Sequence, residues 1–164
     1  MRKNLLSTLF FPILFLSLPA VATEFKPVGE SRLEYYFWDV YDAKLFTPSG
    51  VYEAENHPMK LSLTYLRDFA AKDIVKATNE QWQQLGKTDL VGRFDQLLLN
   101  LWPDIKEGET LAFITDKKGV GVFYHQGEKL GSVDDANFAN DFLAIWLSPK
   151  TSQPQMRKQL IGEQ

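Results

Sequence analysis

Residues Ser31 to Tyr41 read SRLEYYFWDVY and contain five aromatic side chains. As a β-strand, this stretch would place alternate residues on opposite faces of a sheet. One face would carry Leu33, Tyr35, Phe37 and Tyr41, and the other Arg32, Glu34, Tyr36, Trp38 and Val40. We expect the first face to belong to the core. The second has two interpretations: a core strand whose Arg32 pairs with Glu34 or another acid at the sheet edge, or a cleft wall that holds an apolar molecule by its acidic head.

The N-terminus predicts export. Two basic residues precede an apolar run from Leu9 to Leu16, and the small residues of Ala20-Val21-Ala22 follow, which is the order found in a secretory signal peptide. We expect residues 1–22 to be this peptide, with cleavage after Ala22. Residues 23–164 then form one domain in the periplasm or outside the cell. The apolar run is short for a membrane span, so no integral membrane segment is expected after cleavage.

Composition argues against several partners and chemistries. The chain has 18 basic and 21 acidic residues, a formal net charge of −3, whereas nucleic acid requires a basic surface. It has no cysteine, so an exported domain must be held together by its core without disulfides. Its two histidines, His57 and His125, lie beside turn-like residues and outside any recognisable nucleophile or zinc-site pattern. We expect no metal and no cofactor, and both histidines in solvated loops.

The rest of the chain predicts a sheet and helices. The predicted strands are the opening stretch continued to Phe46, residues 51–54 as a possible partner for it, and residues 59–65, 110–115, 120–124 and 129–133. The predicted helices are residues 72–85, a helix from a cap at Thr88 to Leu101, and two C-terminal helices that begin near Asp134 and Ser152. This order predicts an α+β domain with a mostly antiparallel sheet and helices packed on one side.

The end of the segment 59–65 offers two more candidates for a site. Tyr65 closes its apolar–polar alternation and leads into Arg67-Asp68. Arg67 belongs either to a surface ion pair with Asp68 or to a cleft where the strand gives way to a helix.

Several segments together resemble the chalcone isomerase-like proteins of bacteria. They are Arg32-Leu33-Glu34 running to Val40-Tyr41-Asp42-Ala43-Lys44-Leu45, Leu63 to Asp68 (LTYLRD), Trp102 to Glu109 (WPDIKEGE), Gly131 to Ala139 (GSVDDANFA), and Ile145-Trp146-Leu147 with Gln159-Leu160-Ile161-Gly162. The resemblance rests on the order and spacing of these segments and covers nearly all of the chain after residue 22. It implies an open-faced β-sandwich, with helices on one face of a large antiparallel sheet and a ligand cleft between sheet and helices.

The resemblance also implies roles for single residues. In the plant enzymes an early strand arginine supports the reacting phenolate during ring closure of a chalcone, and Arg32 stands at that place. The enzymes also use a threonine, a tyrosine and an asparagine, where this chain has Tyr36 or its neighbour, Ile74 and Gln81. Most groups for proton transfer are therefore replaced. Other branches of the family bind fatty acids without chemistry, with the arginine at the carboxylate.

Our leading hypothesis is an exported, non-catalytic chalcone isomerase-like protein that binds a small amphipathic or acidic molecule, such as a fatty acid. The predicted ligand-binding residues are Arg32, Tyr36, Trp38, Tyr65 and Arg67, and no catalytic residue is predicted. Two alternatives stay open. One is an isomerase of the chalcone–flavanone type in which Arg32 is catalytic. The other is a cell-envelope scaffold whose cleft is filled by side chains and which works through a protein partner.

Overall fold

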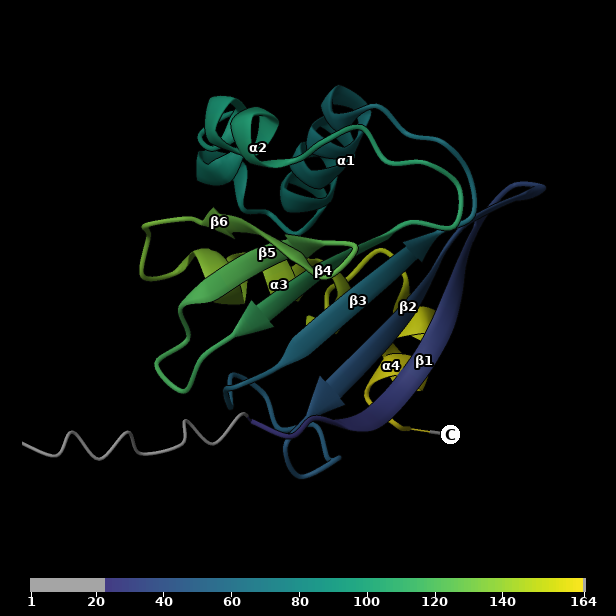
Figure 1. Cartoon of the computed structure of the whole chain (residues 1–164). Helices are drawn as coiled ribbons and strands as arrows, with labels where there is room; N and C mark the ends of the chain where they lie inside the picture. The colour runs from purple at the N-terminus through teal and green to yellow at the C-terminus, as the bar shows by residue number, and fades with distance from the viewer. Residues whose placement is uncertain (1–22, 164) are drawn as a thin grey trace, which may run out of the picture.

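The computed structural model describes residues 23–163 and contains one six-stranded sheet (Figure 1). Every strand pairs antiparallel with the next strand in the sequence, so the sheet is a meander. The strands are β1 (Lys26–Tyr35), β2 (Trp38–Thr47), β3 (Lys60–Tyr65), β4 (Thr110–Thr115), β5 (Gly121–His125) and β6 (Glu128–Ser132). The helices are α1 (Ala71–Gln84), the short 3-10 helix η1 (Thr88–Leu90), α2 (Asp95–Leu101), α3 (Phe138–Leu147) and α4 (Pro154–Leu160). A chain that starts at residue 23 therefore contains every described element.

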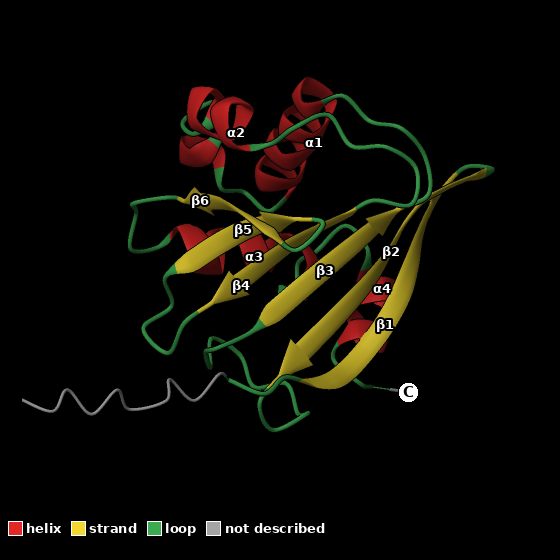
Figure 2. Cartoon of the chain, viewed as in Figure 1, coloured by secondary structure: helices red, strands yellow, loops and turns green. Residues whose placement is uncertain are grey.

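The helices pack on one side of the sheet. In the view of Figures 1 and 2, α3 and α4 lie behind the sheet, while α1 and α2 lie above β6. This arrangement confirms the predicted α+β class, with a mainly antiparallel sheet and a layer of helices. The strands β4 to β6 and the helices α1, α3 and α4 lie close to where the sequence predicts them.

The core between the sheet and the helices is largely aromatic. Phe113 of β4 and Phe123 of β5 contact Phe138 and Phe142 of α3, with ring centroids 5.0 to 6.1 Å apart. The two α3 residues are four positions apart and therefore share one face of the helix. Gly121 of β5 leaves the space that the ring of Phe113 occupies, because a Cβ there would overlap it. Large buried rings supply the stability that a chain without disulfides needs.

Residues 31–41 form a hairpin, so the prediction of one continuous strand is wrong. β1 ends at Tyr35, Tyr36 and Phe37 make a two-residue turn, and β2 begins at Trp38. The sequence does not signal this turn, because it contains no glycine, asparagine or proline. Tyr36 itself adopts the positive φ, 55°, that glycine usually supplies at such a turn.

Two other predicted elements differ from the structure. Residues 51–54 lie in a loop, because β3 occupies the free edge of β2. The predicted helix from Thr88 to Leu101 is interrupted between η1 and α2 by Gly92, which has a φ of 78°. Asn79 of α1 holds this interruption: its side chain accepts a hydrogen bond from the N–H of Gly92 at 3.0 Å and donates one to Asp95 at 2.6 Å.

None of the helices within residues 23–163 has the length and apolar character needed to cross a bilayer. The signal peptide predicted for residues 1–22 lies outside the described residues.

Candidate functional site

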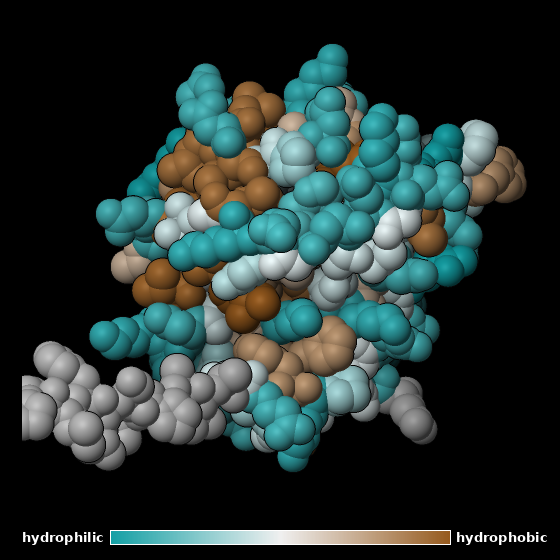
Figure 3. Space-filling view, in the orientation of Figure 1, coloured by the Kyte–Doolittle hydropathy of each residue, from teal (hydrophilic) through white to brown (hydrophobic). Residues whose placement is uncertain are grey.

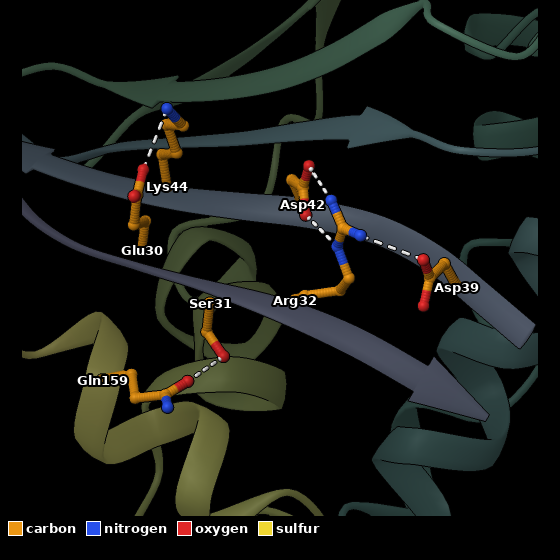
Figure 4. Close-up of polar contacts among 7 residues, drawn as sticks. All are labelled: Glu30, Ser31, Arg32, Asp39, Asp42, Lys44 and Gln159. Atoms are coloured by element: carbon orange, nitrogen blue, oxygen red, sulfur yellow. Dashed lines mark hydrogen bonds and ion pairs between the residues drawn. The ribbon is translucent and has the colours of Figure 1, made fainter. Parts of the chain in front are cut away.

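Arg32 lies on the face of the sheet that the helices leave open (Figure 4). Its Nε and Nη2 atoms donate hydrogen bonds to the two carboxylate oxygens of Asp42, at 2.7 and 3.0 Å, and its Nη1 donates to Asp39 at 2.9 Å. The hydrogen bonds from Arg32 lower the pKa of Asp42, and those to Asp42 raise the pKa of Arg32. Arg32 is therefore paired by acids of the protein, as the first interpretation expects, with Asp42 and Asp39 in place of Glu34.

The open face around Arg32 is charged rather than apolar. Ser31, its neighbour in β1, points the other way and donates a hydrogen bond to Gln159 of α4. On the open face, Glu30 of β1 forms an ion pair with Lys44 of β2 at 2.9 Å. Arg32 thus lacks the apolar cleft wall predicted beside it.

Tyr36 and Trp38 lie at the end of the β1–β2 hairpin, where 81% and 57% of their surfaces are exposed. The guanidinium carbon of Arg67 lies 3.9 Å from the centroid of the Trp38 ring, which is the geometry of a cation–π contact. The structure therefore brings Trp38 and Arg67 together, but at the surface of the protein.

Tyr65 belongs to the opposite, helix-covered face and is only 4% exposed. Its ring lies between those of Tyr41 in β2 and Phe69, with centroids 5.6 and 5.5 Å away. Trp146 of α3 donates a hydrogen bond from Nε1 to the hydroxyl oxygen of Tyr41 at 2.9 Å. Burial raises the pKa of Tyr41 to about 12 and also raises the pKa of Tyr65. Both phenols are therefore neutral hydrogen-bond donors at ordinary pH.

The five predicted ligand-binding residues do not form one site. Arg32 lies on the open face, Tyr65 lies on the helix-covered face, and the other three lie at the end of the hairpin. The prediction of a common cleft fails because strand register decides which side chains share a face, and the register follows from a turn that the sequence does not signal. The turn at residues 36–37 alone would place Arg32 opposite Tyr41, and the bulge between Leu33 and Glu34 shifts the register by one residue, so that Arg32 lies opposite Asp42. The residues not assigned to a site from the sequence are Asp39, Tyr41, Asp42, Trp102 and Trp146.

Trp102 carries a buried polar group without a partner. Its side chain is 3% exposed, and its Nε1–H group has no hydrogen-bond acceptor among the described residues. An unpaired buried donor costs about 1–3 kcal/mol. The ring packs against Phe142, which in turn contacts Trp146, so a row of aromatic rings connects this group with Tyr41.

The two histidines make structural contacts: His57 lies in a loop, as expected, but is partly buried, whereas His125 is the last residue of β5 and not a loop residue. The ring nitrogens of His57 lie 2.8 Å from the Thr115 hydroxyl and 2.9 Å from the Asn140 side-chain oxygen. His125 lies 2.9 Å from a carboxylate oxygen of Glu109. Across residues 23–163, no three side chains of His, Cys, Asp or Glu gather in a way that suits a metal ion.

The family model described as chalcone isomerase-like matches residues 31–162. The chain belongs to the chalcone isomerase-like family. The match begins within β1 and ends after α4, so it includes β2 to β6 and every helix described above.

Two proteins similar to this chalcone isomerase-like chain cover most of its length. An uncharacterized protein from Haemophilus influenzae is 24% identical over 163 residues, which is 96% of this chain and 78% of that protein. The crystal structure of a fatty-acid binding protein from Arabidopsis thaliana matches with a TM-score of 0.66 and 13% identity, covering 87% of this chain and 89% of the plant chain. At this identity the structural likeness shows a shared fold.

The places that the resemblance assigns to catalytic residues of the plant enzymes do not surround Arg32 in this chalcone isomerase-like protein. Tyr36 lies in the exposed hairpin turn. Ile74 of α1 is partly buried against the core, and the side-chain oxygen of Gln81 accepts a hydrogen bond from Ser152 at 2.7 Å. Ile74 cannot supply the phenol of the plant site, and the carboxamide of Gln81 is already bound by Ser152.

Proposed function

We propose that the protein is an exported, non-catalytic member of its family that binds an amphipathic small molecule, such as a fatty acid, between the sheet and the helices. The proposal is carried by two phenols on the helix-covered face, the buried Tyr65 and its partly buried neighbour Tyr41. They are neutral donors in largely apolar surroundings, which is the composition of a ligand pocket: apolar walls with a few polar groups.

We assign the polar head of the ligand to these phenols. The oxygen of Tyr41 accepts the hydrogen bond from Trp146, and its own proton has no acceptor within residues 23–163. A carbonyl or carboxyl oxygen of a ligand would take that proton in a hydrogen bond. A buried donor gains more from such a partner than an exposed one, because water does not compete for it.

We assign the apolar body of the ligand to the boundary between the sheet and α1. Leu33 of β1, Phe69 and Ile74 of α1 are partly buried and pack against the core. Ile74 stands where the resemblance expects a tyrosine of the plant enzymes, so this boundary corresponds to the family's cleft. Binding would part α1 from the sheet along these side chains.

The ligand binds with a neutral head group. Arg32, the cation expected to meet a carboxylate, lies on the other face and is held by Asp42 and Asp39. Without a cation, an ionised carboxylate would lose its hydration uncompensated, so a fatty acid would bind in its protonated form. The fatty-acid binding protein of similar fold supports this class of ligand.

The contacts of Arg32 also support a non-catalytic role over the isomerase alternative. A guanidinium stabilises an oxyanion through donors that are free to meet it. The donors of Arg32 are engaged by two carboxylates. Export is supported by the signal-peptide pattern of residues 1–22.

The proposal is tested by equilibrium binding of a fatty-acid series to the chain that starts at residue 23. Tyr65→Phe deletes a donor and keeps the ring, so we expect affinity to fall about fivefold, the loss of one hydrogen bond of about 1 kcal/mol. The control Arg32→Met, on the open face, should change affinity less than about twofold. Binding should tighten as the pH falls toward the pKa of the acid.

Two results would contradict this proposal. One is the absence of measurable binding across the series, with no small acid or ester released from the purified protein on denaturation. The other is loss of binding in Arg32→Met with Tyr65→Phe unaffected, which would return the site to the open face.

A further inference from the structure

The end of the β1–β2 hairpin carries four consecutive aromatic residues in solvent. Tyr35, Tyr36, Phe37 and Trp38, which we name the aromatic tip, are 63%, 81%, 97% and 57% exposed. The hairpin extends beyond the rest of the sheet, and its end stands out from the body of the molecule (Figures 1 and 3). Contiguous exposed apolar surface of this kind marks an interaction site.

Packing of the core does not explain why these four positions carry aromatic residues. Tyr35 and Tyr36 contact each other, with centroids 4.7 Å apart, and lie outside the core. Tyr36 has a φ of 55°, a conformation that glycine or asparagine adopts at less cost than a bulky residue. A position that breaks a local rule without a packing gain points to a function that depends on the side chain.

The aromatic tip has the depth of the interfacial layer of a bilayer. Charged residues begin one rung behind it, where Glu34 lies opposite Asp39, and Arg32 lies opposite Asp42 further back. The tip consists of one paired rung and the turn, roughly 5–10 Å at about 3.3 Å per residue. Interfacial segments enter membranes to about 5–10 Å. The rings therefore fit this layer while the charged rungs stay in water.

The ring types also suit that layer. Phe37 at the apex has no polar side-chain atom, whereas the tyrosines and Trp38 carry an O–H or N–H at the edge of an apolar ring. Such amphipathic rings are enriched where membranes meet water. We propose that the aromatic tip docks the protein onto the surface of a lipid bilayer.

Arg67 supplies the matching charge. Its guanidinium is stacked on Trp38, and within residues 23–163 it forms no ion pair with an acid. A guanidinium at the level of the interface meets the lipid phosphates, which zwitterionic and anionic lipids share. The contact of Arg67 with the phosphates thus sets how deeply the aromatic rings enter the bilayer.

A second copy of the chain fits the tip less well. Asp39 and Asp42 are paired with Arg32, whereas Glu34 has no ion-pair partner within residues 23–163, so two tips in contact would bring two unpaired carboxylates together, where like charges repel. Around one tip, these three acids nearly balance Arg32 and Arg67, so attachment depends on the rings rather than on net charge. We therefore expect binding to zwitterionic vesicles with little dependence on salt.

The experiment is flotation of the chain from residue 23 with phosphatidylcholine vesicles. The variant Tyr36→Gly with Phe37→Ser removes the two most exposed rings and keeps the turn, because glycine accepts a positive φ. The control, Val51→Ser with Val120→Ser, removes two exposed apolar side chains elsewhere. We expect the unmodified chain and the control to float, and the tip variant to bind at least about tenfold more weakly.

Tryptophan fluorescence adds a second readout. Trp82, Trp102 and Trp146 are already buried, so a blue shift on addition of vesicles reports on Trp38. Raising salt from about 0.05 to about 0.5 M should change binding less than about twofold.

Equal flotation of the unmodified chain and the tip variant, or no flotation of either, overturns the proposal. A dimer that forms without lipid and is lost in the tip variant would assign the tip to a second copy instead. The inference does not rest on fatty-acid binding, since Tyr65 lies on the helix-covered face, and the two activities are lost in different variants.

Discussion

Tyr36 and Tyr65 are the same residue type in opposite surroundings. Tyr36 lies in water at the end of a hairpin, whereas Tyr65 is buried beside Tyr41 on the helix-covered face. The two arginines show the same division, since Arg32 is held by acids and Arg67 stacks on a ring. Their chemistry therefore depends on the partners that the fold provides for each side chain.

The raised pKa of Tyr41 predicts a loss of stability at high pH. An unfolded tyrosine ionises near pH 10, whereas Tyr41 in the folded protein ionises near pH 12. This contribution to stability is complete below about pH 10 and is lost as the pH rises to about 12. Over that window, the free energy of unfolding should fall by up to about 2–3 kcal/mol more in the unmodified chain than in Tyr41→Phe. Urea unfolding at several pH values measures the free energy of unfolding of both proteins. If the two free energies fall in parallel between pH 10 and pH 12, Tyr41 is not the group responsible.

At the scale of elements, the packing of α4 against β1 depends on a glycine. A Cβ at Gly29 of β1 would collide with the backbone carbonyl oxygens of Gln159 and Leu160 in α4. Backbone atoms cannot turn aside as a side chain does, so the helix and the strand must separate.

Gly29→Ala is therefore expected to lower the free energy of unfolding by about 1–3 kcal/mol. Faster proteolysis near the C-terminus should accompany this loss. Glu30→Ala, at the next position and on the open face, is the control and should change stability by less than about 1 kcal/mol. An alanine variant as stable as the unmodified chain would show that α4 shifts without cost.

The elements differ in how far the sequence determines them. The strands β4 to β6 were predictable because alternating segments are separated by turns that contain Gly119 and Gly127. The β1–β2 turn was not, because tyrosine and phenylalanine are atypical there. α2 begins later than predicted because Asn79 of α1 binds Gly92 and Asp95. This contact joins two separate elements, so no local sequence pattern predicts it. In the candidate site, the apolar–polar alternation of residues 59–65 predicted that Tyr65 lies in a strand with one buried face. The contact of Trp146 with Tyr41 was not predictable, because Trp146 belongs to a helix that is distant in the sequence.

At the scale of the whole molecule, one aromatic layer joins the sheet to the helices. Phe142 lies at its centre and contacts Phe113 and Phe123 from the sheet, and Phe138, Trp102 and Trp146 from the helical side. The layer ties distant parts of the chain together, so we expect the domain to unfold in one cooperative step.

Phe142→Ala should destabilise this domain by about 3–5 kcal/mol, because the cavity it leaves is surrounded by rings that cannot collapse into it. Leu99→Ala, which removes an exposed side chain from α2, is the control and should cost much less. Urea unfolding followed by fluorescence and by circular dichroism would give both values. Transitions that do not coincide in the unmodified chain would argue against a single cooperative unit.

The contact between Gly29 and α4 also has a consequence for folding during synthesis on the ribosome. Among the described elements, β1 is synthesised first, but the helix that packs against it, α4, is synthesised after all the others. Because β1 is also an edge strand, its unpaired backbone groups face other nascent chains throughout that delay. We expect the N-terminal half of this domain to need chaperone protection during synthesis, while the β4–β6 meander closes on itself within a short stretch of chain.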